Sequence, residues 1–253
     1  MTKDHGCRAC RDGAALDFDF TMAFQPIVDV GSGHVWAYEA LVRGPNGESA
    51  GTILDRVTDA TRYRFDQAAR VKAIELAGRL FPRGSDTRLS INFMPNAVYE
   101  PNACIRASLE AARRVDFSYR RIMFEFTEQE RFHDIEHVKR IVAAYRQQGF
   151  LTALDDFGAG FAGLNLLANF RPDLIKIDME LVRGIDTDTG RHAIVAGIIG
   201  IARALGVTVL AEGIETAAER EALRGLGITL MQGYHLAKPK LEELPLVDGF
   251  VPR

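Results

Sequence analysis

The chain has 253 residues, of which 47% are hydrophobic and 26% are charged, and its 31 basic and 34 acidic residues give a formal net charge of −3. This composition excludes a largely disordered protein, and the slight acidic excess argues against a protein that binds duplex nucleic acid through a basic surface. The length suits one large barrel or two smaller domains.

The first 20 residues have no apolar periodicity and contain His5, Cys7 and Cys10. We therefore predict a flexible N-terminal tail over residues 1–20 and a single domain over residues 21–253. A Cys-x-x-Cys pair beside a histidine can be half of a metal site or a redox pair. A zinc site needs about four ligands, however, and no second Cys-x-x-Cys pair follows. A reduced, exposed tail is the simpler interpretation.

No apolar run is as long as the about 20 residues that span a bilayer. The polar N-terminus also lacks the apolar core of a secretory signal. We therefore expect a cytoplasmic protein without a membrane span.

From residue 22 onward, short apolar runs alternate with stretches of helical spacing. The runs are rich in Val, Ile, Leu and Phe, as strands buried on both faces are. They cover residues 23–30, 35–42, 88–93, 122–126, 151–154, 174–177, 208–211 and 228–231. This alternation predicts an α/β fold, a TIM-like (β/α)8 barrel, with an open doubly wound sheet as the alternative.

The first two runs are separated only by Gly31-Ser32-Gly33-His34. This connection is too short for a parallel crossover and fits a hairpin, so we expect one antiparallel strand in the barrel.

Helices are expected between the later strands. Residues 135–145 and 194–205 each trace one apolar face at helical spacing. Gly149, Gly206 and Gly227 stand where a left-handed helix end is expected. Thr216 and Glu219 have the spacing of a capping box, so we expect a structural role for Glu219.

Seven consecutive strands carry polar side chains at or near one end. They are Glu39, Asn92, Glu125, Asp155 with Asp156, Lys176 with Asp178, Glu212, and Gln232. Burying a charge costs several kcal/mol unless it is paired or binds a metal. Because the carboxyl ends of barrel strands converge on the active site, we expect these side chains to form one site.

The candidate metal ligands are all oxygen donors, which favours Mg²⁺ or Mn²⁺ over Zn²⁺. They are Glu39, Asn92, Glu125, Asp155, Asp156 and Glu212. Five carboxylates exceed what one divalent ion neutralises, whereas two ions sharing a bridging aspartate would use them and support phosphodiester hydrolysis. Lys176 can orient the attacking water or be a salt-bridged structural lysine. Arg43 can hold a substrate phosphate or be an ordinary rim arginine.

Together these residues resemble the EAL-domain phosphodiesterases, which cleave cyclic di-GMP. The resemblance covers about residues 24–239. The matching segments are Phe24-Gln25-Pro26-Ile27, Glu39-Ala40-Leu41-Val42-Arg43-Gly44, Ile91-Asn92, Glu125-Phe126-Thr127-Glu128, Asp155-Asp156-Phe157-Gly158, Lys176-Ile177-Asp178, Ala211-Glu212-Gly213-Ile214-Glu215-Thr216 and Gln232-Gly233-Tyr234.

The resemblance implies hydrolysis of cyclic di-GMP to linear pGpG by a two-metal mechanism, supported by Mg²⁺ or Mn²⁺ and inhibited by Ca²⁺. This reaction lowers a second messenger in bacterial signalling, with biofilm formation as the expected output. The six candidate ligands would hold the two ions and Lys176 would touch the nucleophilic water, while the choice of general base stays open between Glu212 and Asp156. The resemblance further implies substrate contacts from Gln25, Arg43 and Gln232, and support behind the ligands from Glu128, Glu215 and Asp178.

One segment departs from the family pattern. After the double aspartate the family commonly continues Thr-Gly-Tyr-Ser-Ser, whereas this chain reads Ala159-Gly160-Phe161-Ala162-Gly163 and lacks the hydroxyls. In the family this loop leads to the dimer interface. The resemblance therefore implies a homodimer but leaves the coupling of this loop open.

Two alternatives to an active phosphodiesterase stay open. The chain could be a catalytically weak cyclic di-GMP receptor or protein-interaction module, or it could cleave another phosphate ester. All six ligands are kept, which favours the active enzyme. The predicted tail is too short for a sensor domain, so we expect the input signal to come from a sensor or regulatory partner, from dimerisation or from the tail cysteines.

Overall fold

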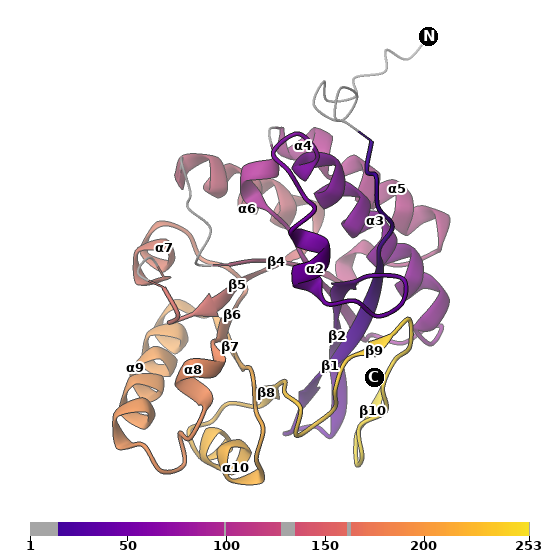
Figure 1. Ribbon diagram of the computed structural model, residues 1–253. Coiled ribbons are helices and arrows are strands. Elements are labelled where there is room, and N and C mark those ends of the chain that lie inside the picture. Colours follow the sequence, from indigo (N-terminus) through magenta and orange to yellow (C-terminus); the bar gives the residue numbers. More distant parts are fainter. Residues whose placement is uncertain (1–14, 99, 128–134, 161–162, 253) are drawn as a thin grey trace.

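The computed structural model describes residues 15–98, 100–127, 135–160 and 163–252 (Figure 1). Within these residues, eight strands close into a barrel, because β1 pairs with both β2 and β8. The barrel strands are β1 (Thr21–Asp29), β2 (His34–Arg43), β3 (Arg88–Asn92), β4 (Ile122–Thr127), β5 (Leu151–Phe157), β6 (Leu174–Ile177), β7 (Thr208–Ala211) and β8 (Leu230–Met231). The predicted TIM-like barrel is confirmed, and the open-sheet alternative is wrong.

The predicted antiparallel strand is β1. It runs antiparallel to β2, with Gln25 opposite Glu39, and antiparallel to β8. The pairings from β2 through β8 are parallel. Two short strands lie outside the barrel, β9 (Lys240–Leu241) against β1 and β10 (Val251–Pro252) against β2.

Helices surround the barrel (Figure 1). The described helices are α2 (Ala50–Leu54), α3 (Arg62–Leu80), α4 (Pro101–Cys104), α5 (Arg106–Arg114), α6 (Ile135–Gln148), α7 (Gly163–Asn169), α8 (Met179–Val182), α9 (Thr189–Leu205) and α10 (Ala217–Gly225), with 3₁₀ turns η1 (Pro95–Ala97) and η2 (Tyr119–Arg121). Among them, none combines the length and the apolar character that crossing a membrane requires.

The predicted helix ends are confirmed. Gly149, Gly206 and Gly227 have φ values of 91°, 69° and 90°, in the left-handed region that glycine enters without strain. At the start of α10, Thr216 and Glu219 form both hydrogen bonds of the capping box. Glu219 also accepts from the Gly184 and Glu215 amides at 2.9 and 2.8 Å, which confirms its structural role.

The predicted boundary after residue 20 is too late. Phe18 and Phe20 are buried, and their ring centroids lie 6.1 and 5.2 Å from that of Phe65 on α3. Rings buried in this way lose water contact that an exposed tail would keep, so the packed body includes Phe18 and Phe20. Cys7 and Cys10 lie outside the described residues.

Candidate active site

The interior of the barrel contains an apolar layer, and the candidate site lies directly above it. The apolar layer consists of Ile27, Ala37, Met123, Ala153, Leu174, Leu210 and Leu230. Residues two apart on a strand point to the same face. On each parallel strand that contributes to the apolar layer, the residue two positions closer to the carboxyl end is a predicted site residue: Glu39, Glu125, Asp155, Lys176, Glu212 or Gln232. On the antiparallel strand β1, the residue two positions before Ile27 is Gln25. Strand alternation alone therefore gathers these predicted site residues.

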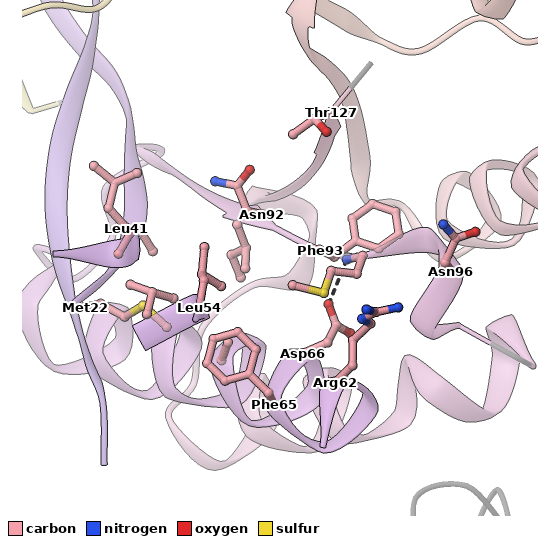
Figure 2. A pocket seen from close by; sticks show the side chains of 16 residues that line it. Met22, Leu41, Leu54, Arg62, Phe65, Asp66, Asn92, Phe93, Asn96 and Thr127 are labelled. Atoms are coloured by element: carbon pink, nitrogen blue, oxygen red, sulfur yellow. Dashed lines mark hydrogen bonds between the residues drawn. The ribbon is translucent and has the colours of Figure 1, made fainter. Parts of the chain in front are cut away.

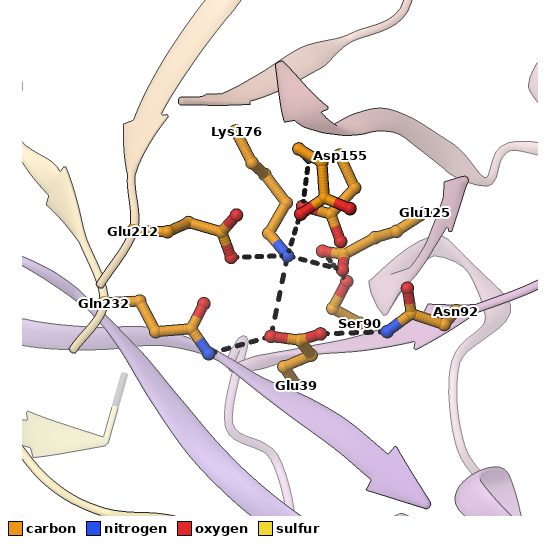
Figure 3. Close-up of polar contacts among 9 residues, drawn as sticks. Glu39, Ser90, Asn92, Glu125, Asp155, Lys176, Glu212 and Gln232 are labelled. Carbon is orange, nitrogen blue, oxygen red and sulfur yellow. Dashed lines mark hydrogen bonds and ion pairs between the residues drawn. The ribbon is translucent and has the colours of Figure 1, made fainter. Parts of the chain in front are cut away.

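The Lys176 ammonium group lies at the centre of four carboxylates (Figure 3). Its Nζ atom is 2.7 Å from Glu212, 2.8 Å from Glu125, 3.1 Å from Asp155 and 3.5 Å from Glu39. Lys176 and Glu125 are fully buried. Among the described residues, Lys176 is the one cation paired with these four acids.

This crowding shifts the protonation of the acids. Burial raises the pKa of Glu125 to about 8, and neighbouring Glu39 and Asp155 add to the rise against the opposing Lys176 charge. Burial and the Asp155 charge also raise the pKa of Asp156 to about 6 and that of Glu212 well above its ordinary value. For Asp155, burial is outweighed by Lys176 and by hydrogen bonds, and its pKa falls. The cluster therefore holds protons near neutral pH that a divalent cation would have to displace.

The Glu39 carboxylate is fixed by two amide side chains (Figure 3). Asn92 donates from Nδ2 to one carboxylate oxygen at 2.9 Å, and Gln232 donates from Nε2 to the other at 2.8 Å. The Asn92 carbonyl oxygen is thereby directed away from Glu39 and is available as a ligand. Gln232 Oε1 is buried without a hydrogen-bond partner among the described residues, as expected of a group that meets a bound molecule.

Ser90 belongs to the site and is absent from the sequence prediction. It lies on β3, two residues before Asn92, is fully buried, and donates a hydrogen bond from its hydroxyl to Glu125 Oε1. The signal in the sequence is the period-two spacing from Asn92, which places both side chains on the same face of β3.

Two carboxylate sets are arranged as cation sites. Glu39, Glu125 and Asp155 can bring one oxygen each within 4.8 Å of one another, and so can Asp155, Asp156 and Glu212. Asp155 belongs to both sets, so one aspartate lies between the two candidate cation sites. Asp156 has a φ of 54°, an unusual value for a residue other than glycine, and its amide donates to Asp155 Oδ1 at 2.9 Å. Such strain is typical of functional positions, and the all-oxygen donor set fits Mg²⁺ or Mn²⁺.

Two cavities border the cluster. One, of about 440 Å³, is polar and is lined by Gln25, Glu39, Asp156, Glu212, Gln232 and Tyr234, among others. The other, of about 510 Å³, is mostly apolar and lies between β2, β3 and α3, with Leu41, Phe65, Asn92 and Met94 in its wall (Figure 2). Glu39 and Asn92, one in each wall, are hydrogen-bonded to each other. A ligand with two large ends can therefore place its middle over the carboxylates.

The remaining predicted site residues lie farther from the cluster. Arg43 donates from Nη1 to the Val42 carbonyl at 2.7 Å and lines neither cavity. Glu215 and Asp178 line the polar cavity; Glu215 is paired with Arg183 at 2.7 Å and Asp178 caps α8.

Two predictions fall wholly or partly outside the described residues. Glu128, which is expected to support the site, lies outside the described residues, and so do positions 161 and 162 of the altered loop.

The sequence matches the EAL domain family over residues 11–239. BluF of Escherichia coli (strain K12), named a blue light- and temperature-regulated antirepressor, is 33% identical over 226 residues, 89% of this chain and 55% of BluF. Other relatives from the same strain, 29–33% identical, are named as cyclic di-GMP phosphodiesterases or probable ones. The chain spans 55% of BluF and less than half of each of these others.

Two solved structures are similar over most of the chain. A standalone versatile EAL protein from Vibrio cholerae O395, bound to c-di-GMP, has a TM-score of 0.89 and 52% identity and covers 92% of this chain and 98% of its own. BlrP1 of Klebsiella pneumoniae, in a complex with manganese and cyclic di-GMP, has a TM-score of 0.82 and 36% identity and covers 88% of this chain and 56% of its own.

Proposed function

This chain belongs to the EAL domain family, and from that premise we propose that it is a metal-dependent phosphodiesterase that hydrolyses cyclic di-GMP to linear pGpG. The observation that carries the proposal is the pair of carboxylate sets sharing Asp155 at the carboxyl end of the barrel. A cluster of this kind is costly to bury around one lysine and is suited to two hard cations. The c-di-GMP bound in two related structures supports cyclic di-GMP as the substrate.

Six residues would hold the two ions: Glu39, Asn92, Glu125, Asp155, Asp156 and Glu212. Mg²⁺ or Mn²⁺ bound there would activate water and stabilise charge on the phosphate and on the leaving oxygen. Ca²⁺ prefers more ligands at longer distances, and we expect it to inhibit.

The protein's own groups would orient water and move a proton. The Lys176 ammonium, with donors directed at several acids, would hold the attacking water in line with the phosphorus–oxygen bond that breaks. Asp156 and Glu212, whose carboxylates line the polar cavity, are the candidates to take the proton of that water. Glu212 contacts Lys176 directly at 2.7 Å.

The two cavities would take the two nucleoside halves of the substrate. Gln25 and Gln232 line the polar cavity and would hydrogen-bond one half, and the apolar cavity with Asn92 in its wall would enclose the other. Arg43, at the end of β2, would need to release the Val42 carbonyl to reach a substrate phosphate.

The proposal is tested by incubating the purified protein with cyclic di-GMP in Mg²⁺, Mn²⁺ or EDTA and identifying the products by chromatography. We expect pGpG with either metal and none with EDTA. The absence of product under all three conditions, with the substrate still bound, would instead assign the chain to the receptor class.

A receptor or interaction module is the second candidate function, because BluF, similar over 89% of this chain, is named an antirepressor. That function needs the barrel but not turnover. The same product analysis separates the two, because a pure receptor binds cyclic di-GMP without forming product.

We also propose that the chain forms a homodimer through an apolar face of α7 and α9. Leu164, Ile194 and Ile201 are 61%, 53% and 41% exposed and line one shallow groove with Gly197. Exposed apolar side chains gathered in this way are typical of an interface. Light scattering after size exclusion should give twice the monomer mass, and Ile194→Glu should return it to the monomer mass.

A further inference from the structure

We propose that Asp66 on α3 is a positioning residue for the candidate metal ligand Asn92, acting through the backbone amide of Met94. The inference rests on the proposed function, because it takes Asn92 to bind a cation. Asp66 lies outside the predicted motifs in the sequence, and its carboxylate is bonded to Met94 and Arg70 rather than to a candidate ligand.

Asp66 forms one half of a buried ion pair. Its Oδ2 atom is 2.7 Å from Arg70 Nη2, one helical turn later, and each side chain is only 2% exposed. Its Oδ1 atom accepts a hydrogen bond from the Met94 amide at 2.8 Å, across the wall of the apolar cavity (Figure 2). One carboxylate therefore joins α3 to the segment that leaves β3 directly after Asn92.

The residue between Asn92 and Met94 is held by the same network. The Phe93 ring lies 5.6 Å from the Tyr145 ring on α6, and the Tyr145 hydroxyl accepts from Arg70 Nη1 at 3.4 Å. The Phe93 amide donates to the Glu125 carbonyl at 2.9 Å. Both residues that follow Asn92 are thus anchored, Phe93 by its ring and its amide, and Met94 by its amide.

Asn92 needs such an anchor more than the other ligands do. It is the last residue of β3 and is exposed at the barrel mouth, whereas Glu39, Glu125 and Asp155 are buried. Packing does not fix its side chain, so the direction of its carbonyl oxygen depends on the backbone and on the 2.9 Å bond to Glu39. A backbone shift after Asn92 would turn that oxygen away from the cation.

Stability alone does not account for the ion pair. A buried pair is often matched or surpassed by apolar residues of similar volume, and its neighbours Phe65, Ala69, Ala73 and Ile74 on α3 are apolar and buried. What apolar residues would not provide is an acceptor for the Met94 amide.

Two double variants isolate that acceptor. Asp66→Asn with Arg70→Gln keeps an oxygen at position 66 and a neutral partner at position 70. Asp66→Leu with Arg70→Gln has a side chain of similar size at position 66 that carries no oxygen acceptor and no amide donor. Asp66→Ala with Arg70→Gln is a smaller acceptor-free variant for use if the leucine variant does not fold.

The readouts are Mn²⁺ affinity by calorimetry, hydrogen exchange of the Met94 amide in EDTA, and the melting temperature. We expect the acceptor-free variant to exchange the Met94 amide faster and to bind Mn²⁺ about tenfold more weakly than the asparagine variant, since groups that orient metal ligands are worth about 10–100-fold in affinity. Equal Mn²⁺ affinities in the two variants, with faster exchange at Met94, would overturn the role of Asp66 while leaving the phosphodiesterase intact. A wild-type protein that binds no Mn²⁺ would overturn the proposed function and this role with it.

Discussion

Replacing Lys176 by methionine removes the one cation at the centre of the carboxylate cluster while keeping the length of the side chain. Four carboxylates lie 2.7–3.5 Å from Nζ, and the side chain is fully buried. At an effective dielectric of about 20, a unit charge pair about 3 Å apart attracts by roughly 5 kcal/mol before desolvation is counted. In the metal-free protein, these acids then lose the positive charge with which they pair.

The expected loss is set by the cost of breaking a buried pair, about 3–5 kcal/mol. For a chain of this length, 1 kcal/mol shifts the melting temperature by about 2–4 °C, so Lys176→Met should melt roughly 6–20 °C below wild type in EDTA. Two bound cations would replace the missing charge, so saturating Mn²⁺ should narrow the gap. Turnover should still fall by at least 100-fold, because the orienting cation is absent.

The assay is thermal unfolding followed by circular dichroism, in EDTA and in saturating Mn²⁺, for both proteins. Lys176→Arg keeps the positive charge and is the matched control, and it should melt closer to wild type in EDTA than Lys176→Met does. The reasoning is refuted if Lys176→Met melts with wild type in EDTA, or if its deficit is the same with and without Mn²⁺.

Three further predictions concern the same cluster. Glu39→Ala should abolish turnover while circular dichroism shows a folded barrel, and near wild-type turnover would remove Glu39 from the site. Mn²⁺ binding should release protons at pH 7, and the Mn²⁺ affinity should rise as the pH rises from about 6 to 8. The reason is that burial raises the pKa of Glu125 to about 8 and that of Asp156 to about 6, and both carboxyl groups must lose their protons to bind the ion. Calorimetry in buffers of different ionisation enthalpy measures the proton release, and binding heats that do not depend on the buffer would contradict it. Gln232→Ala should raise the KM for cyclic di-GMP and also lower kcat, since Gln232 lines the polar cavity and donates a hydrogen bond to Glu39 at 2.8 Å. An unchanged KM would remove it from the substrate contacts.

The sequence predicts the barrel well because its local signals agree with its topology. Apolar runs identify the strands, and the four-residue connection between the first two can only be a hairpin. The gathering of Glu39, Glu125 and Lys176 follows from their positions near strand ends, and the structure places the two carboxylates 3.5 and 2.8 Å from Lys176 Nζ.

The parts that sequence reasoning missed depend on contacts between distant segments. Phe18 and Phe20 carry no periodic signal, and only the nearby Phe65 on α3 makes them part of the packed body. The sequence does not distinguish Ser90 from other serines in strands, and its role becomes visible only from its hydrogen bond to Glu125 on the neighbouring strand. The sequence alone favours an exposed position for an aspartate in a helix, and only the structure shows that Asp66 is buried against Arg70 and the Met94 amide.

The most direct test of the central claim, that these acids hold two cations, is a crystal structure of the protein soaked in Mn²⁺, with anomalous difference maps recorded at the manganese edge. Two peaks about 3.5–4 Å apart, bridged by Asp155 and bounded by the other candidate ligands, are predicted. A single peak away from Asp155, or none in a crystal with an accessible barrel mouth, would contradict the two-metal account.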